Sequence, residues 1–320
     1  MTADQLIMGY SLDELEIVVN PKENHWRTLL PEIYKNEGWS FQEEDMETWQ
    51  DTFKMWFYVA LEKATKKPVA TVFLTLDEAS QNGTEPLYSI GFFYTSPEWR
   101  GTGIGSKLFS EVMKIAGDNN VTLNGVLKMA PRYASKFGFD KIHPFDYHYG
   151  KVMLKDLTPP IEQDELTAKK LTEVPWDDVL AYDFTICPRK RGGFLKRFIW
   201  PSEKTHTRVV LDSNKKIVGL ACVRQEIGGN LAAGPVYADS KEAARLALDT
   251  ILEEDVDKTR HENVGFLYPS INSMAERLLE ELSGGHANPI PFTKSQFTKH
   301  IVETPHDKVF AMSECAASFV

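Results

Sequence analysis

The sequence of 320 residues predicts an α/β (α+β) protein built from two similar domains in tandem. An apolar strand, a glycine-rich loop and an amphipathic helix follow one another over residues 87–116, and a similar order of elements recurs over residues 215–285. Between the two copies, residues 156–166 are rich in proline and acidic side chains, which is typical of a linker. We therefore expect a first domain over residues 1–155 and a second over residues 167–320.

The loop of the first copy is the most informative stretch, because three glycines and an arginine, Arg100–Gly105, stand where a strand turns into a helix. Leu87–Thr95 has the apolar and aromatic composition of a buried strand, and Ser106–Ala116 has apolar residues at helical spacing. The start of a helix leaves backbone N–H groups unpaired at the positive end of the helix dipole, and glycine lets a bulky anion approach them. This arrangement predicts a phosphate-binding loop.

Two nucleotide-binding patterns are excluded by the spacing of the loop. A dinucleotide fingerprint needs Gly-x-Gly-x-x-Gly after the first strand, whereas here the glycines alternate and two apolar runs, Trp56–Leu61 and Val69–Leu76, come earlier. A Walker loop ends in Gly-Lys-Ser/Thr, and the order in Gly105-Ser106-Lys107 is different. After the helix, Thr122–Met129 is expected as a further strand, followed by a short helix that ends at Phe137.

Ser96–Gly105 (SPEWRGTGIG), the helix after it and Ala130–Phe139 (APRYASKFGF) together resemble the GCN5-related N-acetyltransferase (GNAT) family. The resemblance covers roughly residues 15–155 and implies a mixed, mostly antiparallel sheet flanked by helices. It makes Glu16–Val19 the first strand, and it makes His25–Glu37 and Glu43–Phe53 two helices beside the acceptor site.

In that family the loop holds the pyrophosphate of acetyl-CoA, and the preceding strand offers its backbone to the pantetheine arm and the thioester. The resemblance therefore implies acetyl-CoA as cosubstrate. It places the cosubstrate on Phe93, Tyr94, Thr95, Arg100, Gly101, Thr102, Gly103, Ile104, Gly105 and Ser106.

The catalytic residues depart from the family pattern. Many relatives carry a tyrosine four residues before the Gly-Phe of this segment, where it can protonate the leaving thiolate, but here Ala134 stands at that position. Tyr133, one residue earlier and about 100° around the helix, is the first candidate for the acid, with a packing role as the alternative. Tyr94 is the second candidate, unless the alternation of the strand turns it into the core. His143 and His148 are candidates for the base, with a structural role as the alternative.

The second copy lacks the glycine loop. Leu231–Ala238 parallels Leu87–Thr95, and its GPVYADS segment resembles the C-terminal domain of YitH-like proteins. At the following helix start stands Asp239-Ser240-Lys241-Glu242, where we expect Asp239 to cap the helix and the acidic groups to repel a pyrophosphate. We therefore expect acetyl-CoA in the first copy only.

Composition limits the remaining choices. The net charge of -10 argues against nucleic acid as a partner and is compatible with a cationic amine substrate. Three distant cysteines indicate a reducing compartment, and neither cysteines nor histidines have a metal-binding spacing, so no metal is expected. The first residues lack a signal-peptide pattern and no run is long enough to cross a bilayer, which predicts a cytoplasmic protein without membrane association.

We expect an N-acetyltransferase that moves the acetyl group directly from acetyl-CoA to an amine acceptor, a small molecule. The alternative is a non-catalytic acyl-CoA-binding regulatory protein, because the tyrosine of the family pattern is missing at Ala134.

Overall fold

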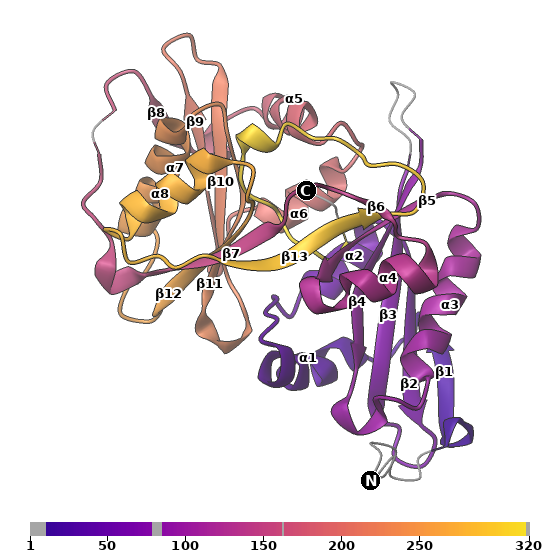
Figure 1. The fold of residues 1–320 in the computed structure, drawn as a ribbon. Coiled ribbons are helices and arrows are strands. Elements are labelled where there is room, and N and C mark those ends of the chain that lie inside the picture. Colours follow the sequence, from indigo (N-terminus) through magenta and orange to yellow (C-terminus); the bar gives the residue numbers. More distant parts are fainter. Residues whose placement is uncertain (1–10, 79–84, 162, 318–320) are drawn as a thin grey trace.

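A computed structural model describes residues 11–78, 85–161 and 163–317, which form one mixed sheet flanked by helices (Figure 1). The helices are α1 (His25–Glu37), α2 (Asp45–Thr52), α3 (Ile104–Ala116), α4 (Ala130–Phe137), α5 (Trp176–Ile186), α6 (Gly192–Ile199), α7 (Lys241–Glu254) and α8 (Ser273–Leu282). The strands of the first half are β1 (Leu15–Val19), β2 (Lys54–Glu62), β3 (Pro68–Asp77), β4 (Leu87–Thr95), β5 (Asn120–Val126), β6 (Lys141–Ile142) and β7 (Tyr147–Met153). Those of the second half are β8 (Thr167–Lys170), β9 (Thr205–Leu211), β10 (Ile217–Gln225), β11 (Leu231–Ala238), β12 (Asn263–Pro269), β13 (Ile290–Phe297) and β14 (Val309–Ala311).

The two halves exchange strands in the middle of the sheet. The strand order is β1-β2-β3-β4-β5-β13-β7-β12-β11-β10-β9-β8, so that β13 of the second half lies between β5 and β7 of the first. Residues 293–297 of β13 pair antiparallel with residues 122–126 of β5, and all of β7 pairs antiparallel with β12. In Figure 1 the yellow strand β13 runs from the orange half toward the purple half. Neither half therefore completes its sheet from one continuous segment of chain.

Three hydrophobic cores hold the helices on the sheet. On one face of the first half, Leu108 and Phe109 of α3 pack against β3, whose residues are buried at nearly every position. In the second half, α7 and α8 cover a core of their own. The third core is shared, because Trp26 and Trp49 of α1 and α2 belong to the same cluster as Phe194 of α6. The halves are thus joined by apolar burial as well as by the exchanged strands.

β4 has a β-bulge in its pairing with β3, and on its other side β4 separates from β5. Phe92 and Phe93 of β4 stand opposite the single residue Val72 of β3, and Phe92 has φ 51°. A bulge bends and twists its strand, and the parallel pairing of β4 with β5 ends at Ser89 and Thr122. Among the residues that the structure describes, the edge of β4 that faces β5 has no strand partner beyond this point.

The second half has an equivalent bulge and an equivalent separation of two parallel strands, but there a further strand occupies the space between them. Gly234 and Pro235 of β11 stand opposite Cys222 of β10, and the parallel pairing of β11 with β12 ends at Ala233 and Phe266. Beyond this point β14 pairs with β11, and the N–H of Met312 donates to the carbonyl of Leu267 on β12 at 2.9 Å. The chain itself occupies the space that stays open in the first half.

Most of the predicted helices and strands are present, within a few residues at their ends. Thr158 and Pro159 of the predicted linker contact α7, because Arg245 Nη2 donates to Thr158 Oγ1 at 2.9 Å and to the Pro159 carbonyl at 3.0 Å. The expectation that Asp239 caps α7 is wrong, since Ser240 Oγ accepts from the N–H of Ala243 at 3.2 Å. Asp239 instead accepts from Lys308 Nζ at 3.0 Å. No helix in the described ranges is long and apolar enough to cross a membrane.

We predict that Gly91→Ala destabilises the protein, because an added Cβ would lie 2.2 Å from the carbonyl oxygen of Ala316 and 2.7 Å from the ring of Phe73. Overpacking of this kind costs about 1–3 kcal/mol. Thermal unfolding measures the effect, and Gly193→Ala in α6 is the matched control, because its Cβ would meet Thr52 only at 3.9 Å. Equal melting temperatures for Gly91→Ala and the parent would contradict the close approach of the C-terminal segment to β4.

Candidate functional site

The glycine loop presents unpaired backbone N–H groups at the start of α3. Gly101 and Gly103 have φ 88° and 93°, a conformation that side chains with a Cβ rarely adopt, and Gly103 is the N-cap without a capping side chain. Among the described residues, nothing accepts a hydrogen bond from the N–H groups of Gly105 and Ser106. A Cβ at Gly105 would lie 2.8 Å from Thr95 Oγ1, so glycine is required for α3 to approach β4. The loop is therefore suited to bind an anion.

A cavity of about 570 Å³ begins at this loop and continues through the gap between β4 and β5 to the second half. Of the residues predicted to bind the cosubstrate, all except Thr102 and Ile104 line it. The Thr102 hydroxyl donates to the Trp99 carbonyl at 2.8 Å, and Ile104 is buried in the core beneath α3. The second half contributes side chains to the far end of the cavity, among them Phe198, Arg224, Glu226 and Phe292.

Basic side chains of α4 lie beside the loop. Lys136 Nζ donates to Ser106 Oγ at 2.8 Å, and Arg132 Nη2 lies 3.5 Å from the same oxygen. Both basic side chains are exposed and so can turn toward a bound anion. Sequence reasoning missed them, although Lys128, Arg132 and Lys136 recur every four residues, a spacing that places them on one face of a helix.

The Arg100 guanidinium is engaged in contacts with α1 and β4 and is not left free at the glycine loop. Its Nη2 forms an ion pair with Glu37 Oε1 of α1 at 2.6 Å, and its Nε donates to the Thr95 carbonyl at 2.9 Å. The Arg100 side chain therefore joins the loop to α1 and to the end of β4, and the backbone N–H groups form the anion site.

The two candidate tyrosines differ in their surroundings. The Tyr94 hydroxyl donates to Glu32 Oε1 at 2.9 Å and accepts from Asn36 Nδ2 at 2.8 Å, and burial raises its pKa. Tyr133 lines the cavity, its ring stacks on Phe109 with centroids 5.7 Å apart, and its hydroxyl has no hydrogen bond within the described ranges. Burial raises the pKa of Tyr133 to about 12, so this hydroxyl keeps its proton over the physiological range. Neither His143 nor His148 lines the cavity.

Glu226, which sequence reasoning missed, is an acidic group at this cavity with a strongly raised pKa. It follows β10 by one residue and is partly buried. Burial raises its pKa from 4.5 to about 8, the nearby Asp45 raises it further, and Arg224 and a hydrogen bond from Ser40 oppose the shift. A perturbed carboxyl group in a cavity indicates a functional role. No local motif marks Glu226, because Ser40 and Asp45, two of the groups that shift its pKa, come from the first half of the chain.

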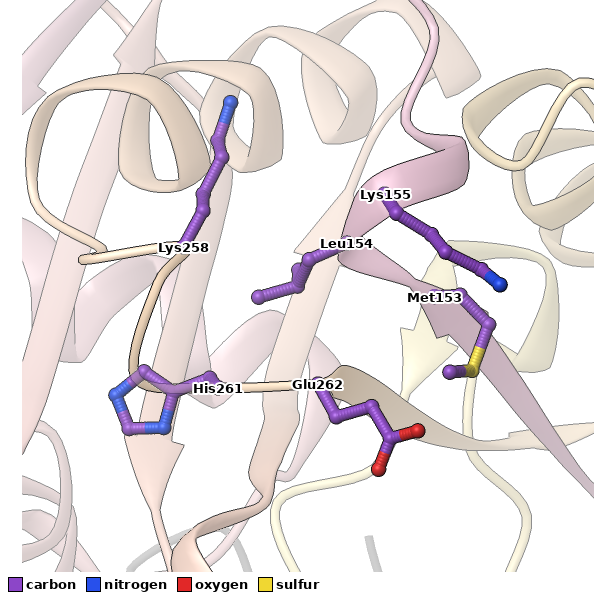
Figure 2. A pocket seen from close by; sticks show the side chains of 6 residues that line it. All are labelled: Met153, Leu154, Lys155, Lys258, His261 and Glu262. Atoms are coloured by element: carbon purple, nitrogen blue, oxygen red, sulfur yellow. The ribbon is translucent and has the colours of Figure 1, made fainter.

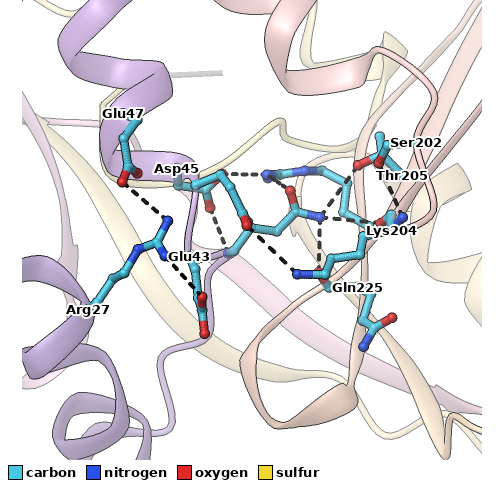
Figure 3. A network of polar contacts seen from close by, with 11 residues as sticks. Arg27, Glu43, Asp45, Glu47, Ser202, Lys204, Thr205 and Gln225 are labelled. Atoms are coloured by element: carbon cyan, nitrogen blue, oxygen red, sulfur yellow. Dashed lines mark hydrogen bonds and ion pairs between the residues drawn. The ribbon is translucent and has the colours of Figure 1, made fainter.

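A buried polar network fixes the strand end that carries Glu226 (Figure 3). Arg224 Nη2 donates to the Asp45 carboxylate and to Gln42 Oε1, the latter at 2.6 Å, while its guanidinium lies 3.6 Å from the ring centroid of Phe198. Gln42 Nε2 in turn donates to the Gln225 carbonyl at 3.0 Å. These contacts tie the loop before α2 to β10 and so hold the two walls of the cavity together.

Other candidate groups are less suited to chemistry. A second pocket of about 270 Å³ is lined by Lys155 and Lys258, but in Figure 2 these side chains extend in different directions and do not converge on one anion. In the basic run at 189–191, Arg191 is buried and forms a two-bond ion pair with Asp183. Burial raises the pKa of Cys187 to about 12, which makes it a poor nucleophile.

The comparisons with known proteins define the class of fold. The chain is similar to a putative acetyltransferase from Pyrococcus horikoshii, with a TM-score of 0.70 and 14% identity over 97% of this chain and 98% of that one. It is also similar to a tandem GNAT protein from the clavulanic acid biosynthesis pathway, with a TM-score of 0.64 and 14% identity over 89% of this chain and 97% of that one. The fold is therefore that of tandem GNAT proteins.

The family matches divide along the chain. The family described as "Protein of unknown function (DUF1248)" matches residues 12–186, more than half of the sequence, and the chain belongs to this family. The acetyltransferase (GNAT) domain matches residues 179–281, in the half that lacks the glycine loop. An uncharacterized protein of Caenorhabditis elegans is 27% identical over 171 residues, which cover 50% of this chain and 52% of that protein. The chain thus spans about half the length of this curated relative.

We predict that Glu226→Gln stabilises the protein at pH 8.5 relative to the parent, but not at pH 5. Between the ordinary pKa of 4.5 and the folded pKa of about 8, the folded state binds more protons than the unfolded state, so parent stability falls as the pH rises. Glutamine has no proton to lose and removes this part of the pH dependence. Urea unfolding at both pH values measures the difference, and a parallel loss of stability in parent and variant would contradict the raised pKa.

Proposed function

We propose that this protein is an acyl-CoA-dependent N-acyltransferase that uses acetyl-CoA as donor and a small-molecule amine as acceptor. One observation supports this most strongly: the uncapped start of α3 and the edge of β4 open into the same cavity, which Glu226 also lines. The GNAT fold supports acyl transfer in general. The donor and the acceptor class are our inference from the geometry and charge of the cavity.

The donor site combines backbone and side-chain groups. The pyrophosphate would accept hydrogen bonds from the N–H groups of Gly105 and Ser106, with Arg132 and Lys136 beside it. The pantetheine arm would pair with the edge of β4 that has no strand partner after Ser89. The thioester would then lie between Tyr133 and the second half, both of which line the cavity.

The second half offers no equivalent donor site. Ser240 caps α7, Asp239 pairs with Lys308, and β14 pairs with β11 where the first half has its gap. These contacts support the expectation of one acyl-CoA per chain.

In the proposed chemical step, the Glu226 side chain accepts one proton and the Tyr133 side chain donates another. The acceptor ammonium first gives a proton to the Glu226 carboxylate, and the free amine then attacks the carbonyl carbon of the thioester. The C–N bond forms, the C–S bond breaks, and the amine nitrogen loses a second proton to water. The leaving thiolate takes its proton from the Tyr133 hydroxyl. The products are an amide and CoA. Tyr133 regains its proton from solvent and Glu226 releases its proton to solvent, which restores both side chains.

The far end of the cavity favours a cationic acceptor with an apolar body. Within the described part of the chain the carboxyl group of Glu226 forms no ion pair, whereas Asp45 is paired with Arg224. Aromatic rings, among them Phe41, Phe198 and Phe292, line the same region and can pack against a hydrophobic amine.

We predict that Gly103→Asp abolishes acetyl-CoA binding, because its side chain would enter the loop with a negative charge and a Cβ at this position meets no protein atom within 4 Å. Isothermal titration should give one site per chain for the parent and at least tenfold weaker binding for the variant. Gly117→Asp at the other end of α3 is the matched control, since it also has a positive φ and open space. Unchanged affinity in a folded Gly103→Asp protein, or two sites in the parent, would contradict the proposed donor site.

We predict that Glu226→Gln and Tyr133→Phe both lower kcat by about 10²–10⁴-fold with little change in donor affinity. Release of free thiol over a panel of small amines is the assay, and it also identifies the acceptor. In the parent the rate should rise with pH up to about 8, as Glu226 loses its proton, and this limb should disappear in Glu226→Gln. Tyr94→Phe is the comparison for Tyr133→Phe, because the Tyr94 hydroxyl is already bonded to Glu32. Donor binding without turnover of any amine would instead favour the regulatory alternative.

A further inference from the structure

A cluster of metal-ligating side chains lies outside the cavity, where the two halves meet. His143 follows β6 in the first half, and Glu303 and His306 belong to the segment between β13 and β14. One ligand atom from each of the three lies within 4.8 Å of the others. His143 and His306 are only 3% and 9% exposed, whereas Glu303 is exposed, so the cluster is buried on one side and open to solvent on the other.

His306 is oriented as a metal ligand would be. Its Nε2 is buried and has no hydrogen-bond partner within the described part of the chain, which is unusual for a polar atom without access to water. Its Nδ1 lies 2.5 Å from Thr304 Oγ1. When Nδ1 donates its proton to this oxygen, the lone pair is left on Nε2, which is how hydrogen bonds orient the ligand atoms of metal-binding histidines.

Aromatic rings surround the two imidazoles on their buried side. The His143 ring stacks on Phe145 with centroids 4.7 Å apart, lies 5.0 Å from the His306 ring and lies 5.8 Å from the ring of Phe297. These contacts hold the two imidazoles next to each other.

We propose that His143, Glu303 and His306 bind one Zn²⁺ ion, with water as the fourth ligand. Two imidazole nitrogens and a carboxylate oxygen form a donor set that zinc accepts in tetrahedral geometry. None of the three side chains lines the large cavity, so the ion does not contact a substrate bound there.

The ion joins the loop after β6 to the segment that leads into β14. Residues Met312–Ala316, which follow β14 directly, line the acyl-transfer cavity. Zinc therefore stabilises the position of a cavity wall from a distance. The sequence expectation of no metal rested on residue spacing, and the ligands come from segments that only the tertiary fold brings together.

The test uses the full-length chain, freed of metal with a chelator and then dialysed against zinc chloride. Elemental analysis should find one zinc per chain in the parent, and zinc should raise the melting temperature until chelator is added again. His306→Ala should lose the ion, and Glu303→Gln, whose exposed side chain is not needed for folding, should bind zinc at least tenfold more weakly. His300→Ala, an exposed histidine of the same segment, is the matched control and should keep the ion. Cobalt(II) in place of zinc should give the visible absorption of a four-coordinate ion.

Two results would overturn the proposal: stoichiometric zinc that Glu303→Gln and His306→Ala retain at parental affinity, or a parent that binds no zinc above the level of His306→Ala. If His306→Ala does not fold, Glu303→Gln decides alone. Donor binding, measured separately in the loop variants, does not enter this test, so failure of the zinc site leaves the proposed acyl transfer untouched.

Discussion

The pairing of β13 with both β5 and β7 is the interaction on which the rest of the structure depends. Through it, backbone hydrogen bonds join the halves into one sheet, and neither half can move away without exposing unpaired N–H and C=O groups. The shared core of α1, α2 and α6 then becomes continuous across the junction. As a result the cavity has walls from both halves, and groups such as Tyr133 and Glu226 face one space although they lie far apart in the sequence.

The same kind of β-bulge occurs in both halves of the protein but has a different consequence in each. Each has a bulge of two residues opposite one, at Phe92 and at Gly234, and in each the following parallel pair of strands separates. In the first half the gap stays open beside an uncapped helix start, so backbone donors remain available to a ligand. In the second half β14 pairs in the gap and Ser240 caps the helix, so the same donors are satisfied by the protein.

Where the second half lines the cavity, the opposite charges of Asp45 and Arg224 are balanced in an ion pair. Asp45 and Arg224 neutralise each other in a buried network, and separating such a pair by removing one partner typically costs about 3–5 kcal/mol. Burial raises the pKa of Glu226, close by, more than Arg224 and Ser40 lower it. The network fixes the position of the strand end that carries this carboxyl group.

The sequence by itself determined the order of helices and strands, the repeat and the glycine loop, because strand periodicity, helical spacing and glycine conformation are local properties. It also contained the basic spacing of Lys128, Arg132 and Lys136, which local reasoning could have used. Only the tertiary structure decided the exchange of β7 and β13, the filling of the second gap by β14 and the raised pKa of Glu226. Strand partners, burial and the charges around a carboxyl group depend on residues far apart in the chain, and no local pattern records which distant segments will meet.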